Sequence, residues 1–404
     1  MLLDDLQNEV FDYNKMSKDD LIAQIEQEYQ MKEIEKKYNI KQGGGTDNRW
    51  YCMIDGKRSK RFTDKKDLLK YLISLEEKEE NKNQSIHDIE KGWKEYRRQS
   101  KSAGTFRIDM RNYNNYISCS PIVNRPIIKL TIDDAVDWFK YCKSKKPDMK
   151  EKYYSNVFGT LNSIFEYAKG KKIIERNPFE NFKPHRDQFA PKRIHKDEHD
   201  IFLPDEKTKI KELLWKQNDN KALAILLLFN LGLREGELMA LQWNAIQKNK
   251  IEIKAEYIEE TNSNGDFCGF KFVDHCKSKS GQRELLLNSE SLKIINELKK
   301  YNLKHGIPMD DNDFIFLRKK GNQLLPFTPR TIYSTLEKFC KKAEMNQIKS
   351  SHDIRRTVFT DLFYAGMPLK DIQKFAGHAT MAQTEAYIKF RRNEDTVNYL
   401  EAII

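Results

Sequence analysis

Residues 223–243 read LAILLLFNLGLREGELMALQW and place charged side chains directly after the most apolar run of the chain. Residues 226–233 predict a buried helix that ends in a glycine turn at Gly232. Arg234 follows at once, and Glu237 lies three residues further on. Because an isolated buried charge is costly, Arg234 needs a partner, which is either Glu237 or an anionic ligand. This stretch alone leaves both explanations open.

A second group of polar residues lies near the C-terminus. Residues 351–357 read SHDIRRT, so His352 and Arg355 are three apart and share one face of a helix. A Gly-His pair that ends at His378 is followed nine residues later by Tyr387. Each of these residues has a structural explanation by itself, and no short match of this kind is specific alone.

In combination the residues are specific. An arginine, then HxxR, then Gly-His, then a tyrosine, in this order, resembles the tyrosine recombinases, the phage-type integrases. The resemblance covers residues 86–404 and is sharpest over 223–243 and 351–390. It points to integrases of phages and of integrative and conjugative elements. It therefore implies a site-specific recombinase that cleaves and rejoins DNA through a 3′-phosphotyrosyl intermediate, integrating and excising a mobile genetic element.

The resemblance implies a nucleophile and a base for this reaction. Tyr387 matches the nucleophile, which attacks the phosphodiester and releases a 5′-hydroxyl. A phenol has an unperturbed pKa of about 10, so it needs help to attack near neutral pH. His352 matches the residue proposed as general base.

The resemblance also implies a set of groups that hold the phosphate. Arg234 and Arg355 match the pair that clamps the non-bridging oxygens, and His378 matches a phosphate hydrogen-bond donor. Glu237 matches an acidic position of the family, which we interpret as an orienting residue. Guanidinium groups stay charged and present their donors in a planar fork. We therefore expect no metal and no cofactor.

The acid that protonates the leaving group is harder to assign. The family uses a lysine in a β-hairpin turn between the two motif blocks, and residues 276–285 read CKSKSGQREL here. The Lys-Ser-Gly turn before a strand favours Lys279. Lys277 is the alternative, because a shift of two residues keeps the same strand face. Both could instead be ordinary lysines that contact the DNA backbone.

The N-terminal region suggests a separate DNA-binding module at residues 42–75. An Asp-Gly pair between two strand-like runs predicts a hairpin, and a helix follows. Eight bases and four acids make this segment basic. It resembles the arm-type module of integrases, although an exposed, solvated hairpin is the alternative. The expected DNA contacts are Arg49, Trp50, Lys57, Arg58, Lys60 and Arg61.

We predict a multidomain, mainly α protein. Its parts are an N-terminal helical segment of open role, a small β-sheet-plus-helix module, an all-α core-binding domain, an α+β catalytic domain with a small antiparallel sheet, and a C-terminal tail. The tail either folds back on its own domain or docks on a neighbouring protomer, and we favour docking. Residues 76–85 are expected to be a linker. The boundaries are 1–41, 42–75, 86–182, 200–392 and 393–404.

Composition agrees with a DNA-binding protein of the cytoplasm. The chain has 404 residues, a formal net charge of +11, and six cysteines without a paired motif. It contains no apolar stretch long enough to cross a membrane. The expected partners are double-stranded DNA at attachment sites, three further copies of the chain in a homotetramer, and possible excision and host DNA-bending proteins.

Three other functions compete with this interpretation. Residues 195–199 read HKDEH, a zinc metallopeptidase pattern, but they lie in a charged segment without an apolar stripe. A DNA-binding protein without catalysis would be expected to lack parts of the active-site set. A type IB topoisomerase shares the chemistry, but the additional N-terminal domains favour a recombinase.

Overall fold

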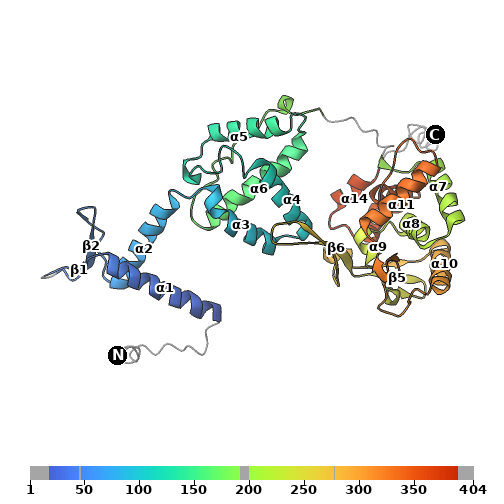
Figure 1. Ribbon diagram of the computed structural model, residues 1–404, viewed down its shortest axis with the longest axis horizontal. Coiled ribbons are helices and arrows are strands. Elements are labelled where there is room, and N and C mark those ends of the chain that lie inside the picture. Colours follow the sequence, from blue (N-terminus) through green and yellow to red (C-terminus); the bar gives the residue numbers. More distant parts are fainter. Residues whose placement is uncertain (1–17, 45–46, 192–199, 277, 390–404) are drawn as a thin grey trace. The chain divides into compact units, whose positions relative to one another are not determined.

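The computed structural model describes residues 18–44, 47–191, 200–276 and 278–389 (Figure 1). The chain divides into two compact units. One comprises residues 1–100 with 109–191, and the other comprises residues 101–108 with 192–404. Among the described residues, no helix is long and apolar enough to cross a membrane. The expected tail, residues 393–404, and the HxxEH match at 195–199 lie outside the described residues.

The N-terminal module is a three-stranded antiparallel sheet with strand order β1-β2-β3, accompanied by two helices (Figure 1). The Asp-Gly turn is present, with positive φ angles at Asp55 and Gly56. Cys52, Leu68 and Leu72 are fully buried in its small core. The elements are α1 (Lys18–Lys37), β1 (Ile40–Gln42), β2 (Trp50–Ile54), β3 (Lys57–Arg58) and α2 (Lys65–Asn81).

The expected linker at 76–85 is largely wrong, because α2 continues to Asn81. Glutamate and lysine have high helix propensity, so a polar run without an apolar stripe can still be helical. The absence of an apolar stripe indicated only that these residues are not part of a core.

The helical domain packs four helices around buried aromatic side chains, consistent with the all-α domain expected there. The indole N–H of Trp93 donates to Ser163 Oγ (3.0 Å), and that of Trp138 donates to the carbonyl of Tyr116 (2.9 Å). Both indoles are therefore buried without losing their hydrogen bonds. The helices are α3 (Ile86–Ser100), α4 (Ala103–Tyr116), α5 (Ile132–Lys145) and α6 (Glu151–Gly170).

The catalytic domain surrounds one central helix, α8, which α7, α10, α11 and α12 pack against. Antiparallel strands form a β4-β5-β8 sheet and two separate hairpins, β6-β7 and β9-β10. The elements are α7 (Pro204–Gln217), α8 (Asn220–Leu231), α9 (Glu235–Met239), β4 (Ile246–Gln247), β5 (Lys250–Ile253), β6 (Glu256–Thr261), β7 (Phe267–Val273), β8 (Arg283–Leu286), α10 (Ser289–His305), β9 (Leu317–Lys320), β10 (Gln323–Pro326), α11 (Pro329–Lys342), α12 (Ser351–Tyr364), α13 (Leu369–Ala376) and α14 (Met381–Tyr387).

The strands around the lysine turn differ from the expected hairpin. The chain before the turn forms two strands, β5 and β6, which belong to different sheets. Consequently β7 pairs with β6 while β8 pairs with β5, and the lysine turn connects two sheets. Apolar alternation does not show where a strand passes from one sheet to another.

Candidate active site

The first arginine is placed by the helix end that the sequence predicts. Helix α8 is apolar on all sides and ends at Gly232, whose φ of 56° is left-handed. A Cβ at Gly232 would come 3.0 Å from the ring of Phe359, so glycine is needed for packing as well as for the turn. Arg234 then caps the N-terminus of α9, and its side chain remains about one-third exposed (36%).

Glu237 is the centre of the cluster and is fully buried. It accepts hydrogen bonds from Nη1 of Arg234 (2.6 Å), and from Nη1 (3.1 Å) and Nη2 (2.9 Å) of Arg283. Burial alone would raise the pKa of Glu237, but hydrogen bonds and positive charge from Arg283, with Arg355 and Arg234, lower it to about 2. Glu237 is therefore an ionised carboxylate that holds two guanidinium groups in place, as its orienting role requires.

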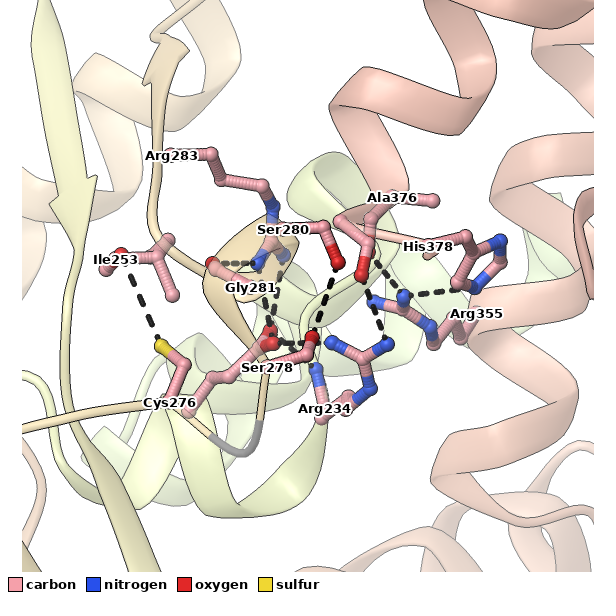
Figure 2. Close-up of polar contacts among 12 residues, drawn as sticks. Arg234, Ile253, Cys276, Ser278, Ser280, Gly281, Arg283, Arg355, Ala376 and His378 are labelled. Carbon is pink, nitrogen blue, oxygen red and sulfur yellow. Dashed lines mark hydrogen bonds and ion pairs between the residues drawn. The ribbon is translucent and has the colours of Figure 1, made fainter. Parts of the chain in front are cut away.

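Arg355 lies beneath the site and is only 1% exposed. It comes from α12, and its guanidinium donates to the backbone carbonyls of Gly232 and Ala376. Burial and the charge of Arg234 lower the pKa of Arg355, but a guanidinium remains protonated at neutral pH. Figure 2 shows Arg234, Arg283 and Arg355 gathered around this point, so the predicted pair of arginines is joined by a third.

His378 is held in one tautomer. Arg355 Nη2 lies 3.1 Å from His378 Nε2, and because arginine can only donate, Nε2 is the acceptor (Figure 2). The proton is thus on Nδ1, which donates to Thr384 Oγ1 at 3.1 Å. Burial, followed by the charges of Arg355 and Arg234, lowers the pKa of His378 to about 3. In this arrangement His378 is neutral and orients Arg355.

Tyr387 and His352 lie in contact in the same chain. Tyr387 ends α14, and its ring centroid is 4.9 Å from that of His352 and 4.7 Å from that of His378. The guanidinium carbon of Arg355 is 5.7 Å from the tyrosine ring. Burial and the charge of Arg356 lower the pKa of His352. His352 is therefore a neutral imidazole at neutral pH and can accept a proton.

The lysine turn lies against the Gly-His motif, as its backbone shows. Lys279 begins a 3-10 turn that ends at Gly281. A Cβ at Gly377 would come 2.9 Å from the carbonyl oxygen of Ser280, and Gly377 has a left-handed φ of 65°. The turn therefore faces the site. Lys277 and the side chain of Lys279 lie outside the described part of the chain.

Two groups near the site were missed from the sequence. Arg283, on β8, is almost fully buried and donates to the carbonyls of Phe375 (2.8 Å) and Gly281 (2.9 Å) as well as to Glu237. Ser351, next to His352, donates to the half-buried carboxylate of Glu235. Both residues lie in stretches quoted above, but neither was singled out, because a local pattern does not reveal partners this far away in the chain.

The expected DNA contacts of the N-terminal module do not share one environment. Lys57, Arg58 and Lys60 lie in and after β3, and Trp50 packs against the module core. Arg49 and Arg61 both form ion pairs with Asp47. Across the strands, Lys41 faces Tyr51 and Met53 faces Arg58. The face opposite the core therefore combines basic and aromatic side chains, with Arg58 stacked 4.9 Å from the Tyr51 ring.

Comparison with known proteins identifies the family. The description "Phage integrase family" applies to residues 205–394, which include every active-site residue placed above. Residues 205–394 therefore belong to the phage integrase family. The protein is a tyrosine-type site-specific DNA recombinase, as the order of its motifs predicted.

Relatives and solved structures agree with this identification. The recombinase is 27% identical to a XerC-like tyrosine recombinase of Caldanaerobacter subterraneus, over 71% of this chain and 74% of the relative. It is 27% identical to the ICEBs1 integrase of Bacillus subtilis, over 64% and 66% of the two chains. The fold matches the Tn1549 transposon integrase in complex with circular intermediate DNA, with a TM-score of 0.61, 20% identity, and coverage of 80% and 100%.

Positive charge at the site comes from guanidinium groups, which can stabilise a developing anion. Within the described ranges, no group of three or more histidine, cysteine, aspartate or glutamate side chains is arranged to hold a metal ion.

Proposed function

We propose that this recombinase integrates and excises a mobile genetic element by cutting and rejoining DNA at attachment sites through a covalent bond to Tyr387. The observation that carries the proposal is the convergence of Tyr387, His352 and the buried arginine cluster within one chain. Two relatives support the mobile-element role by name, the ICEBs1 integrase and a probable prophage integrase of Lactococcus lactis (25% identical, over 80% and 83% of the two chains).

The proposed reaction assigns each proton and bond. The Tyr387 oxygen attacks phosphorus, and its proton passes to His352. The bond from phosphorus to the 5′ oxygen breaks, and that oxygen takes a proton from Lys279, with Lys277 as the alternative. Arg234 and Arg355 bind the non-bridging oxygens. Ligation is the reverse attack by a 5′-hydroxyl, so the diester bond energy is kept and no cofactor is consumed.

His378 can donate a hydrogen bond to a phosphate through Nε2 only if that nitrogen carries a proton. Its Nε2 accepts from Arg355 in the free protein. Donation from Nε2 to a phosphate requires either the other tautomer or a second proton. We propose that a bound phosphate, by drawing Arg355 toward itself, frees Nε2 for this change.

The test uses DNA flanking the ends of the element, made as nicked substrates that trap the covalent intermediate. The unaltered chain is expected to form a protein–DNA adduct on a denaturing gel, without added metal. Tyr387→Phe should reduce the adduct by at least about a thousandfold, because the nucleophilic oxygen is removed. Tyr333→Phe, at an exposed tyrosine on α11, serves as the control. An adduct that survives Tyr387→Phe would contradict the assignment.

We also propose that the open face of the N-terminal sheet binds accessory DNA sites. Charge and stacking on this face support the proposal, through Lys41, Tyr51 and Arg58. Arg58→Ala should weaken binding to such DNA by about the same factor for all sequences. It should also reduce the slope of log affinity against log salt concentration by about one, because one phosphate contact is lost. Lys36→Ala, on the acidic helix α1, is the control. Unchanged affinity of the Arg58 variant would contradict the proposal.

The assembly and the location follow from the same proposal. The solved lambda integrase structure is a tetramer bound to a Holliday junction (14% identical, TM-score 0.54, coverage of 87% and 95%). We propose a homotetramer on two DNA duplexes for this recombinase, acting in the cytoplasm where its DNA is found. An excision factor and a host DNA-bending protein are proposed as further partners.

A further inference from the structure

The segment that enters the catalytic domain runs along the back of the active-site helix. Its first three described residues, 200–202, lie against α12. The backbone N–H of Phe202 donates to Thr357 Oγ1 (2.8 Å), and the buried Lys349 donates to the carbonyl of Ile201. The first bond attaches the segment to α12, the helix that carries His352 and Arg355, and the second attaches it to the residue just before the N-cap of α12.

Asp200 connects this segment to the nucleophile. Its Oδ2 lies 3.4 Å from Nη1 of Arg356 on α12, and 3.5 Å from Nζ of Lys389. Lys389 is two residues after Tyr387, and its backbone N–H donates to the buried Thr360 on α12 (3.2 Å). One carboxylate therefore joins three parts of the domain: the entering segment, the active-site helix and the end of the nucleophile segment.

The ion pairs of Asp200 with Arg356 and Lys389 are partly buried, which strengthens them. The side chains of Lys389, Arg356 and Asp200 are 19%, 25% and 28% exposed. Ion pairs at this depth are less screened by salt than fully exposed ones. Asp353, on the first turn of α12, lies 3.4 Å from the same Nη1 of Arg356, so Asp200 and Asp353 share Arg356, and the contact of Asp200 with Lys389 is what reaches the Tyr387 segment.

We propose that Asp200 is a positioning residue that fixes the Tyr387 segment through Lys389, so that the chain entering the catalytic domain sets where the nucleophile lies. Asp200 touches neither DNA nor the reacting atoms in this role. The inference rests on the proposed function, because it takes Tyr387 as the nucleophile.

The test is a double-mutant cycle on the full chain, read as the single-turnover rate of adduct formation on the nicked substrate. Asp200→Asn and Lys389→Met should each slow adduct formation by about fivefold, as expected for a partly buried ion pair. The double variant should be no slower than either single variant, because both remove the same contact. Asp200→Glu should restore most of the rate. DNA affinity should stay unchanged in all variants, and the unfolding temperature should fall by no more than a few degrees.

The control is Asp205→Asn, which removes an exposed acid from the first turn of α7 in the same domain. It should cleave at the unaltered rate. Effects that multiply to about twenty-five-fold in the double variant would overturn the proposal. So would a loss of DNA affinity in Lys389→Met, which would assign Lys389 to phosphate binding. If the unaltered chain forms no adduct, the proposed function fails, and that result is distinct from either outcome.

Discussion

The arginine side and the tyrosine side of the active site are held in different ways. The arginine side comprises Arg234, Arg283 and Arg355 around Glu237, and most of its charged atoms are buried and hydrogen-bonded. The tyrosine side comprises Tyr387, which is half-buried, and His352, whose ring is partly desolvated but still open to solvent, and ring contacts join them. Groups that bind a phosphate act best when they are already in place. A nucleophile that becomes attached to DNA and is later released needs more freedom.

The largest expected effect tests the rigidity of the arginine side. Glu237→Gln keeps the shape but leaves Arg283 and Arg355 without their buried counter-charge, which should lower the free energy of unfolding by about 3 kcal/mol. Because the pKa of Glu237 falls from 4.5 to about 2 on folding, its contribution is complete above about pH 4.5 and is lost as the pH falls toward 2. Denaturant unfolding at pH 7 and between pH 2 and 5 measures both effects.

The matched control for this prediction is Glu284→Gln. Glu284 pairs with Lys250 at the surface, where it is 59% exposed, so its loss should change stability by less than about 1 kcal/mol. A similar change in both variants would show that the arginine side is no more rigid than the surface.

Arg283 provides a second test of the arginine side, because its guanidinium donates two hydrogen bonds to Glu237. Arg283→Gln removes the charge and the fork that reaches Glu237 and the Phe375 carbonyl. We expect a loss of about 2 kcal/mol in stability and about tenfold slower adduct formation, since Arg234 loses its fixed partner. Arg283→Lys should recover part of both, because it restores charge but not planar geometry. Adduct formation at the unaltered rate in Arg283→Gln would show that Arg234 needs no such support.

The smallest effect concerns the tyrosine side and its pH dependence. Burial and Arg356 lower the pKa of His352 below its ordinary value of 6.5. A base must be unprotonated to act, so the fall in cleavage rate on acidification should begin below pH 6.5. Cleavage rates measured between pH 5 and 8 would show this fall on acidification, and His352→Gln should abolish it. A midpoint above pH 6.5 would mean that His352 is not the base or is not shielded.

Much of the site could be predicted because its motifs carry strong local signals. The apolar helix α8, its glycine end, and the HxxR pair on α12 each follow from spacing and composition. Arg283 could not be predicted, since nothing around it in the sequence indicates burial, and its partner Glu237 lies 46 residues away. Trp50, expected at DNA, is partly buried against the core of the N-terminal module, and the sequence of a two-sided strand does not reveal which face is covered.

The fold was predicted least well where apolar patterns are weak. Helix α14 carries Tyr387 but has one buried residue, Thr384, so no stripe marked it. The β9-β10 hairpin was missed because residues 317–326 are mostly charged or exposed. In both places the tertiary contacts, more than the local sequence, determine the structure.

The buried cluster around Glu237 has a consequence for charge balance during the reaction. Three guanidiniums and one carboxylate leave a net charge of +2, while both histidines are neutral at neutral pH. A phosphodiester brings about one negative charge, whereas the five-coordinate phosphorane carries about two. The cluster therefore carries more positive charge than the bound diester needs, and its attraction increases as negative charge develops on the phosphorane. A site of this kind binds the transition state more tightly than the DNA it starts from, which is the condition for catalysis.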